Sequence, residues 1–180
     1  MNNHLRLIDY PLDGERGIIR QVKETIAAAA GKAPRGWLGP TGAETVNTLD
    51  HLAAEGFDYV CDWRCDDQPI PMRVRTGRMI AMPYNQGVSD RQLFLFRSYT
   101  GEQYTRTVCD QFDTLYEEGA KNGRVMGLGM HPFIIGLPYR IKALDNALKY
   151  ICSHKDVWCA TAGEICDWYC QHCYEDPGRP

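Results

Sequence analysis

No apolar run in the 180-residue sequence approaches the roughly 20 residues that a helix needs to cross a bilayer. The first ten residues, MNNHLRLIDY, show neither the basic and apolar regions of a secretory leader nor its cleavage site. Basic residues are not in excess, because the formal net charge is −3. This charge gives no electrostatic case for nucleic acid or anionic lipid as a partner. We therefore expect a cytoplasmic protein that binds neither nucleic acid nor membrane.

The sequence also contains no internal repeat, low-complexity segment or linker. Its composition, 44% hydrophobic and 24% charged residues, is typical of a globular protein. A chain of this length can bury one sizeable core. We therefore expect residues 1–180 to form a single domain.

Eight cysteines are present, a density below that of a disulfide scaffold. In a cytoplasmic protein we expect them to be reduced, most of them as small apolar fillers of the core. Cys166, Cys170 and Cys173 have the C-x3-C-x2-C spacing of an iron–sulfur loop, and His172 could complete a zinc site. The same spacing places the three thiols on one face of a helix. We favour the helical interpretation and keep the iron–sulfur or zinc site as the lesser alternative.

Helical and extended patterns alternate along the chain. The apolar spacing predicts helices over residues 14–31, 44–56, 102–120, 141–151 and 164–173. Short apolar runs predict strands over 35–38, 58–62, 78–84, 125–130 and 157–160. This alternation is typical of βα units around a parallel sheet. Five strands are too few for a closed barrel of about 250 residues, so the chain is either an open sheet or part of a barrel. We favour part of a barrel, because the first helix leaves no room for a preceding strand.

Two helix starts carry the sequence of a capping box. Thr41-Gly-Ala-Glu44 precedes a helix expected to bury Val46, Leu49 and Ala53, and Thr161-Ala-Gly-Glu164 opens the last helix.

Polar residues follow three of the predicted strands, where βα loops build active sites. The groups are residues 35–40, residues 62–67, and His131 with Pro132, whose missing N–H ends strand pairing. A carboxylate can activate water, an arginine can keep it ionised, and a histidine can protonate a leaving group. The candidate catalytic residues are Arg35, Asp62 and His131, and the candidate substrate-binding residues are Trp37, Trp63, Asp66 and Asp67.

Each candidate also has a structural interpretation. His131 could be a core histidine held by a neighbouring group, and Arg35 could be half of an ion pair. Asp66-Asp67 could form a solvated turn, and the two tryptophans could belong to the core. The case for a site depends on all three groups lying at the same end of successive strands.

Four segments resemble the later motifs of a known family. They are RGWLGP (35–40), FDYVCDWRCDDQPIP (57–71), VMGLGMHPFIIGLPYR (125–140) and DVWCATAGEICDWY (156–169). Together they resemble the polysaccharide deacetylase (NodB-homology) superfamily, closest to its cytoplasmic branch of metal-independent allantoinases and related cyclic amide hydrolases. The resemblance runs from about residue 31 to residue 169. It implies an α/β fold, a distorted (β/α) barrel incomplete at its N-terminal side. The implied reaction is hydrolysis of a carbon–nitrogen bond in an amide, a ureide or an N-acetyl group of a carbohydrate.

The resemblance also implies residue roles. Arg35 would orient the catalytic aspartate, and Asp62 with Trp63 would orient the histidine and line the site. His131 would be the general acid. Asp66 and Asp67 stand in a DDxP element that is frequent in this branch. We therefore expect Asp62 to lie near His131 and to favour its charged form.

Two family motifs are missing from these 180 residues. The T-F-D-D-G-like strand end, which supplies the base and a metal ligand, is absent, and so is the motif of paired histidines. Asn2, Asn3 and His4 lie where that second motif would finish. We therefore expect the C-terminal portion of such a domain, without a metal site or cofactor of its own and inactive alone. A divalent metal such as zinc is an option for a longer form.

The expected partner is a small-molecule amide, ureide or N-acetyl sugar, with a homo-oligomer as one option. The alternative function is a non-catalytic remnant of the same fold that binds a ligand or a partner chain.

Overall fold

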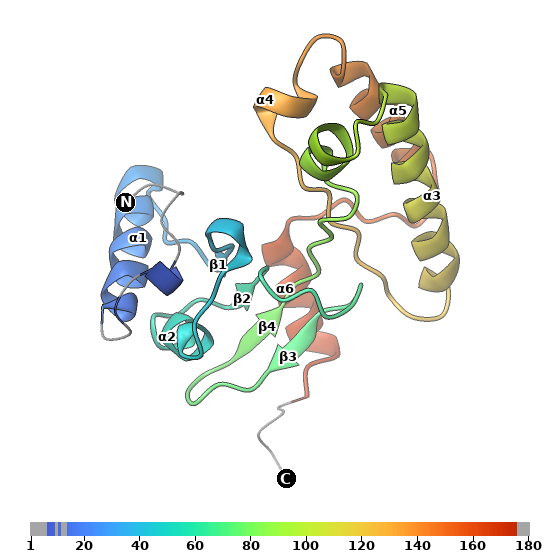
Figure 1. The fold of residues 1–180 in the computed structure, drawn as a ribbon. Coiled ribbons are helices and arrows are strands. Elements are labelled where there is room, and N and C mark those ends of the chain that lie inside the picture. The colour runs from blue at the N-terminus through green and yellow to red at the C-terminus, as the bar shows by residue number, and fades with distance from the viewer. Residues whose placement is uncertain (1–6, 10, 12–13, 176–180) are drawn as a thin grey trace. The chain divides into compact units, whose positions relative to one another are not determined.

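The computed structural model describes residues 7–9, 11 and 14–175, which fall into two compact units (Figure 1). Unit 1 contains the described residues up to Met82 together with residues 160–175, and unit 2 contains residues 83–159. Among these residues, no helix is long and apolar enough to cross a membrane. The single domain expected over residues 1–180 stays a prediction.

Unit 1 combines a small sheet with helices. Its elements are η1 (Leu7–Asp9), α1 (Glu15–Ala30), β1 (Gly36–Trp37), η2 (Pro40–Gly42), α2 (Thr48–Ala54), β2 (Tyr59–Val60), β3 (Ile70–Met72), β4 (Met79–Ala81) and α6 (Ala162–His172). The described part of unit 2 is helical, with η3 (Arg91–Phe96), α3 (Gly101–Gly119), α4 (Pro132–Ile135) and α5 (Ile141–Cys152).

The sheet of unit 1 has the strand order β1-β2-β4-β3. The first three strands are parallel, which confirms the pairing predicted for residues 35–38, 58–62 and 78–84. The antiparallel strand β3 was not predicted, and it contains Pro71, a residue that central strands exclude. An edge strand tolerates proline, since one side of its backbone needs no ladder partner. Pro71 lies opposite Ile80 at that edge.

Helices cover both faces of this sheet. Neighbouring residues of a strand point to opposite faces, so each strand contributes side chains to both layers of packing. Val60 and Met79 belong to the core under α1 and α2, which also buries Ile19 and Leu52 completely. Ile80 packs with Cys166 of α6 on the other face, and Figure 1 shows α6 beside the sheet. The structure therefore confirms the predicted α/β class.

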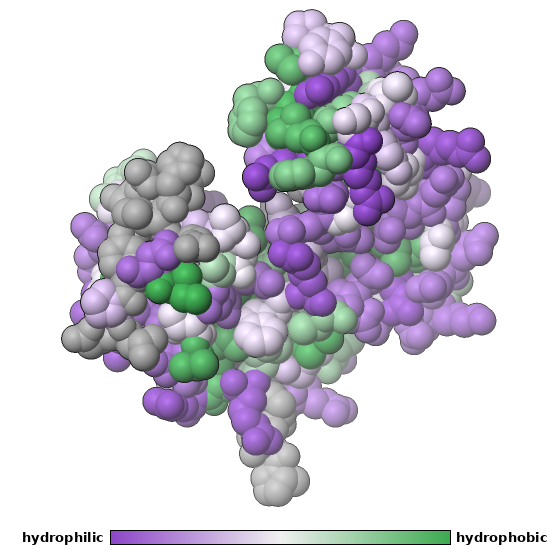
Figure 2. Space-filling model, viewed as in Figure 1, coloured by the Kyte–Doolittle hydropathy of each residue, from purple (hydrophilic) through white to green (hydrophobic). Residues whose placement is uncertain are grey.

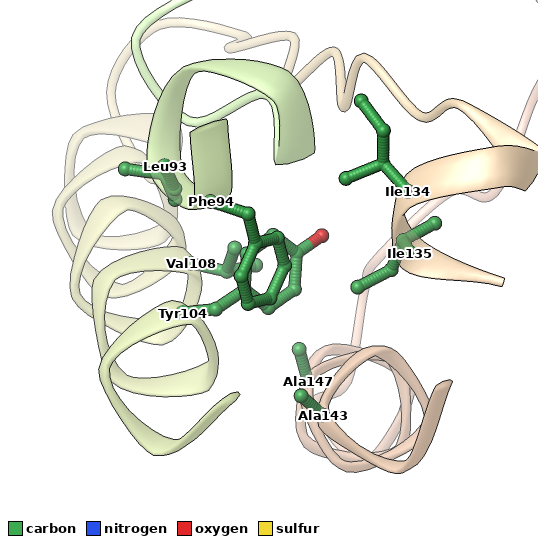
Figure 3. Packing of buried hydrophobic residues seen from close by; sticks show 8 residues of the cluster. All are labelled: Leu93, Phe94, Tyr104, Val108, Ile134, Ile135, Ala143 and Ala147. Carbon is green, nitrogen blue, oxygen red and sulfur yellow. The ribbon is translucent and has the colours of Figure 1, made fainter. Parts of the chain in front are cut away.

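The core of unit 2 is formed by its four helical elements (Figure 3). The rings of Phe94 and Tyr104 stack with centroids 5.1 Å apart. The buried side chains of α5 are the small residues Ala143 and Ala147, so that α5 can approach α3 closely. The apolar face predicted for this helix was therefore partly wrong, since its Ile141 is 45% exposed.

Two of the predicted strands were wrong. Neither residues 125–130 nor residues 157–160 form a strand in the structure. In the first segment, a side chain at Gly127 would lie 3.2 Å from the oxygen of Pro83. A side chain at Gly129 would lie 3.0 Å from Cβ of Ser89. The two glycines of this segment thus allow close packing against residues 83–89 and do not belong to a ladder.

The two capping boxes had different outcomes. At α6, Thr161 accepts a hydrogen bond from the backbone of Glu164 and the Glu164 carboxylate accepts the Thr161 N–H, as predicted. At Thr41 the prediction was wrong, because Thr41 lies in the turn η2 with φ of 63° and α2 begins only at Thr48. Val46, expected in the core, is 91% exposed. Glu44 therefore has another role, described below.

Candidate functional site

His131 is held by Asp90, a buried carboxylate in the same unit. One Asp90 oxygen lies 2.7 Å from His131 Nδ1, and the other accepts the backbone N–H of His131 at 2.7 Å. Asp90 is fully buried, whereas the side chain of His131 is 35% exposed. Because a carboxylate only accepts hydrogen bonds, Nδ1 is the donor and Nε2 is the nitrogen that can exchange a proton with a ligand.

Asp90 and His131 are 41 positions apart in the sequence, and the local backbone structure brings them together. Asp90 is the N-cap of η3, a π-helical turn, and also accepts the N–H of Arg91 at 2.6 Å. Its own N–H donates to the oxygen of Gly129, two residues before His131, at 3.1 Å. Pro132 starts α4 and leaves His131 as the N-cap in an extended conformation. Short π-helical segments of this kind are frequent at functional sites.

The surface around His131 is apolar. Phe133 is 70% exposed, and its ring lies edge-on to the imidazole with centroids 5.6 Å apart. Met130 and Tyr139 are also exposed. Figure 2 shows hydrophobic side chains, in green, gathered around the position of α4. A ligand at this histidine would therefore meet an ionisable ring beside an exposed aromatic side chain.

Sequence reasoning missed Asp90. The predicted partner of His131 was Asp62, which belongs to unit 1, so its approach to His131 stays a prediction. The available signal was weak: Ser89-Asp90 stands before a short apolar run, RQLFLF, which could have indicated a helix N-cap. Nothing in that run points to a residue 41 positions away.

In unit 1, Asp62 is held at the end of β2 by the backbone of Gly39. Both carboxylate oxygens of Asp62 lie 2.9 Å from the Gly39 N–H nitrogen. A side chain at Gly39 would come within 3.0 Å of Asp62 Oδ2 and 3.3 Å of Trp37 Nε1. Glycine at this position thus allows the carboxylate and the indole to approach the same stretch of backbone.

Glu44 is a second carboxyl group beside Asp62, and sequence reasoning assigned it to a capping box. Trp63 donates its indole N–H to Glu44 Oε2 at 2.6 Å, whereas Glu44 Oε1 is buried without a donor. Burial, opposed by that hydrogen bond and reinforced by the charge of Asp62, raises the pKa of Glu44 to about 7. Burial also raises the pKa of Asp62. One proton shared between Glu44 and Asp62 explains how the two groups can lie together.

Glu44→Gln tests this shared proton. The folded pKa of Glu44 is above the ordinary carboxyl value, so the wild type loses stability as pH rises from about 4.5 through about 7. Glutamine is neutral throughout. Between about pH 4.5 and pH 7, we expect the free energy of unfolding of the variant to rise by about 1–2 kcal/mol relative to that of the wild type. Urea unfolding at several pH values would measure this difference.

Glu117→Gln is the matched control, because Glu117 is an exposed glutamate on α3. Its stability difference from the wild type should not change over the same pH range. A flat difference for Glu44→Gln as well would show that Glu44 is ionised like a surface carboxylate.

Arg35 forms an ion pair inside unit 1. It donates to Asp58 at 2.6 Å and, with two nitrogens, to Asp167 of α6 at 2.5 and 2.9 Å. These bonds raise the pKa of Arg35 and lower that of Asp167. The contacts match the ion-pair interpretation, in which Arg35 fixes α6 to the sheet. Its role in orienting a catalytic aspartate stays a prediction.

The remaining candidates divide between core and surface. Trp37 is 7% exposed and packs edge-on to Phe57, as the core interpretation predicts, but its indole N–H has no partner. Trp63 is 43% exposed. Asp66 is exposed and accepts the N–H of Asp67, which matches a solvated turn.

The metal alternatives find no support in the described residues. In the ranges 7–9, 11 and 14–175, no three His, Cys, Asp or Glu side chains are placed to hold a metal ion. These residues alone do not make up a metal site, we derive no step through a metal, and the divalent metal of a longer form stays an expectation. His4, with Asn2 and Asn3, lies outside the described residues.

The cysteine expectations were only partly right. All eight are free, but Cys65, Cys152, Cys159 and Cys173 are exposed, so half of them are not core fillers. Cys166 is fully buried on α6, as the helical interpretation predicts. Burial, followed by the neighbouring Cys170, raises the pKa of its thiol to about 12. A metal site needs thiolates, so this environment disfavours the iron–sulfur or zinc alternative.

Comparison with known proteins places this geometry in a family context. No family model matches the chain. It is 28% identical over 167 residues to a protein of Schizosaccharomyces pombe (strain 972 / ATCC 24843) named as a polysaccharide deacetylase, which covers 83% of this chain and 52% of that protein. A solved structure from Pseudomonas aeruginosa PAO1, also named as a polysaccharide deacetylase, matches with TM-score 0.83 and 30% identity over 92% of this chain and 56% of its own. PuuE allantoinase matches with TM-score 0.84 and 29% identity over the same shares.

The chain has the polysaccharide deacetylase fold. A structure from Mycobacterium smegmatis, 24% identical with TM-score 0.85, supports the fold alone, over 98% of this chain and 64% of its own. The resemblance to hydrolases of the polysaccharide deacetylase superfamily, including its allantoinase-like branch, is confirmed. The chain spans about half the length of the curated relative that it matches.

Proposed function

We propose that the protein belongs to a hydrolase of carbon–nitrogen bonds in amides, ureides or N-acetyl groups, with His131 as the general acid. The observation that carries this proposal is the hydrogen bond between His131 Nδ1 and the buried carboxylate of Asp90. That bond holds the imidazole in one orientation and directs proton exchange to Nε2. The departing nitrogen of an amide must be protonated to leave, and a positioned histidine is suited to that step.

The unsatisfied polar atoms of unit 1 suit the same substrate class. Trp37 Nε1 is a buried donor without a protein partner, and the buried Glu44 Oε1 has no donor other than the carboxyl proton that Glu44 shares with Asp62. Buried polar groups are costly unless they are paired, and an amide or ureide offers both a carbonyl oxygen and an N–H. We propose Trp37, Asp62 and Trp63 as substrate-contacting residues. The expected partner is a small molecule, which is also what the allantoinase and deacetylase relatives suggest.

These 180 residues leave the general base unassigned, because no T-F-D-D-G-like strand end is among them. We expect no turnover by the 180-residue chain alone, and hydrolysis by a longer form that carries such a strand end. Both should be assayed on allantoin, a cyclic imide and an N-acetylated sugar oligomer, with and without added zinc.

Either of two results would contradict this expectation. Turnover by the 180-residue chain that disappears in His131→Ala would place the base within this chain, with Glu44 as the first residue to test. A longer form that hydrolyses none of the substrates but binds one of them would favour the non-catalytic alternative.

A further inference from the structure

Unit 2 contains a pair of cysteine thiols that the proposed hydrolase chemistry does not use. Cys152 is the last residue of α5, and Cys159 follows seven positions later. Their sulfur atoms lie 4.0 Å apart, and both residues are exposed. A separation of 4.0 Å is thiol contact without a covalent bond, about 2 Å longer than a disulfide.

The intervening loop is fixed at several points. The backbone N–H of His154 donates to Ile151, and Tyr116 of α3 donates its hydroxyl to the backbone oxygen of Lys155 at 3.1 Å. The His154 ring packs edge-on to Tyr150 and Tyr116 with centroids 4.7 and 5.1 Å apart. These contacts fix the part of the loop that follows Cys152, up to Lys155.

A metal ion is a poor fit for this pair. A structural metal site needs three or four ligands, and the part of the chain that the structure describes provides no group of three suitable side chains. A pair of accessible thiols in contact is instead the arrangement in which one thiol can attack a disulfide and the other can resolve the product.

We propose that Cys152 and Cys159 form a reversible disulfide by exchange with a low-molecular-weight disulfide of the oxidised glutathione class. The inference is independent of the proposed hydrolase function, because it uses none of that site's residues. The bond would close the loop of residues 153–158 onto the end of α5.

The exchange proceeds in two balanced steps. The Cys159 thiolate attacks one sulfur of oxidised glutathione, forms a mixed disulfide and expels one glutathione thiolate. The Cys152 thiolate then attacks the Cys159 sulfur and expels the second glutathione thiolate, and the two cysteine protons pass to the two expelled thiolates. Either thiol can donate the hydrogen bond between the two sulfurs, and the same two steps balance with Cys152 as the first nucleophile.

The test is thiol mapping of the reduced 180-residue protein after incubation with oxidised glutathione. Trypsin cleaves after Lys155, between the two cysteines, so a disulfide keeps the flanking peptides linked until dithiothreitol is added. We expect this linked product. Glutathione should remain on Cys152 or Cys159 in less than about a tenth of molecules, because the second thiol attacks the mixed disulfide at high effective concentration.

Variants make the assignment specific. In Cys152→Ser and in Cys159→Ser the remaining cysteine should retain glutathione and the linked product should be lost. Cys65→Ser, which removes an exposed cysteine of unit 1, should behave like the wild type. Stable glutathione on Cys152 and Cys159 of the wild type, or linkage of Cys152 to Cys166, Cys170 or Cys173, would overturn the proposal.

Discussion

Replacing His131 with alanine should lower kcat by about 10²–10⁴ in a form of the protein that turns over, with a smaller change in KM. The departing nitrogen then has to take its proton from water, whereas substrate contacts elsewhere are kept. Steady-state kinetics on the best substrate of the assay above would measure the effect, normalised to the fraction of folded protein. The expected loss is large because Asp90 already holds the imidazole in place, so the wild type needs no reorganisation before proton transfer.

His154→Ala is a matched control in the same unit. His154 donates a hydrogen bond from Nδ1 to the backbone oxygen of Tyr150 at 2.9 Å and packs against aromatic rings. It should turn over normally per folded molecule. If His131→Ala instead loses stability and keeps its kcat, His131 is a core histidine, and the catalytic interpretation is wrong.

Asp90→Ala should lower the free energy of unfolding of unit 2 by about 3 kcal/mol. The carboxylate accepts hydrogen bonds from the backbone of Arg91, the backbone of His131 and the His131 ring, and it is fully buried. Alanine leaves those donors without their acceptor and also removes the N-cap of η3. Amide hydrogen exchange of unit 2 would measure the loss, and kinetics would show kcat falling as well.

Two further variants separate charge from packing at Asp90. Asp90→Asn keeps the shape and one acceptor oxygen, so it should lose less stability while still disturbing the His131 ring. Asp110→Ala, at an exposed residue of α3 in an i, i+4 ion pair, should change stability by less than about 0.5 kcal/mol. Equal stability of Asp90→Ala and Asp110→Ala would contradict the buried hydrogen-bond network.

The helices with complete local signals were the easiest to predict. Residues 14–31 contain apolar spacing and a glycine stop, and α1 ends at a left-handed Gly31. The Thr161 capping box sets the start of α6 through two bonds within four residues. At Thr41 the same four-residue pattern was misleading. There Pro40 and the positive φ of Thr41 form a tight turn, and Glu44 turns to Trp63 instead.

Strand predictions depended on partners that local patterns do not show. The parallel pairing of β1, β2 and β4 was predicted because buried parallel strands read as short apolar runs. Residues 125–130 give the same signal, yet their glycines pack against residues 83–89 without forming a ladder. An apolar run shows that a segment is buried, but it does not show which backbone, if any, pairs with it.

The sequence by itself indicated the resemblance to polysaccharide deacetylases, the α/β class and His131 as the residue to test, because these depend on motifs and periodicities read along the chain. Only the tertiary structure decided the partners: Asp90 for His131, Glu44 beside Asp62, and Asp58 with Asp167 for Arg35. Hydrogen bonds and shared protons depend on distances of about 3 Å between residues that are 18 to more than 100 positions apart. Sequence spacing carries no information on such distances, so a carboxylate that looks like a helix cap or a solvated residue can be the group that sets the chemistry of a site.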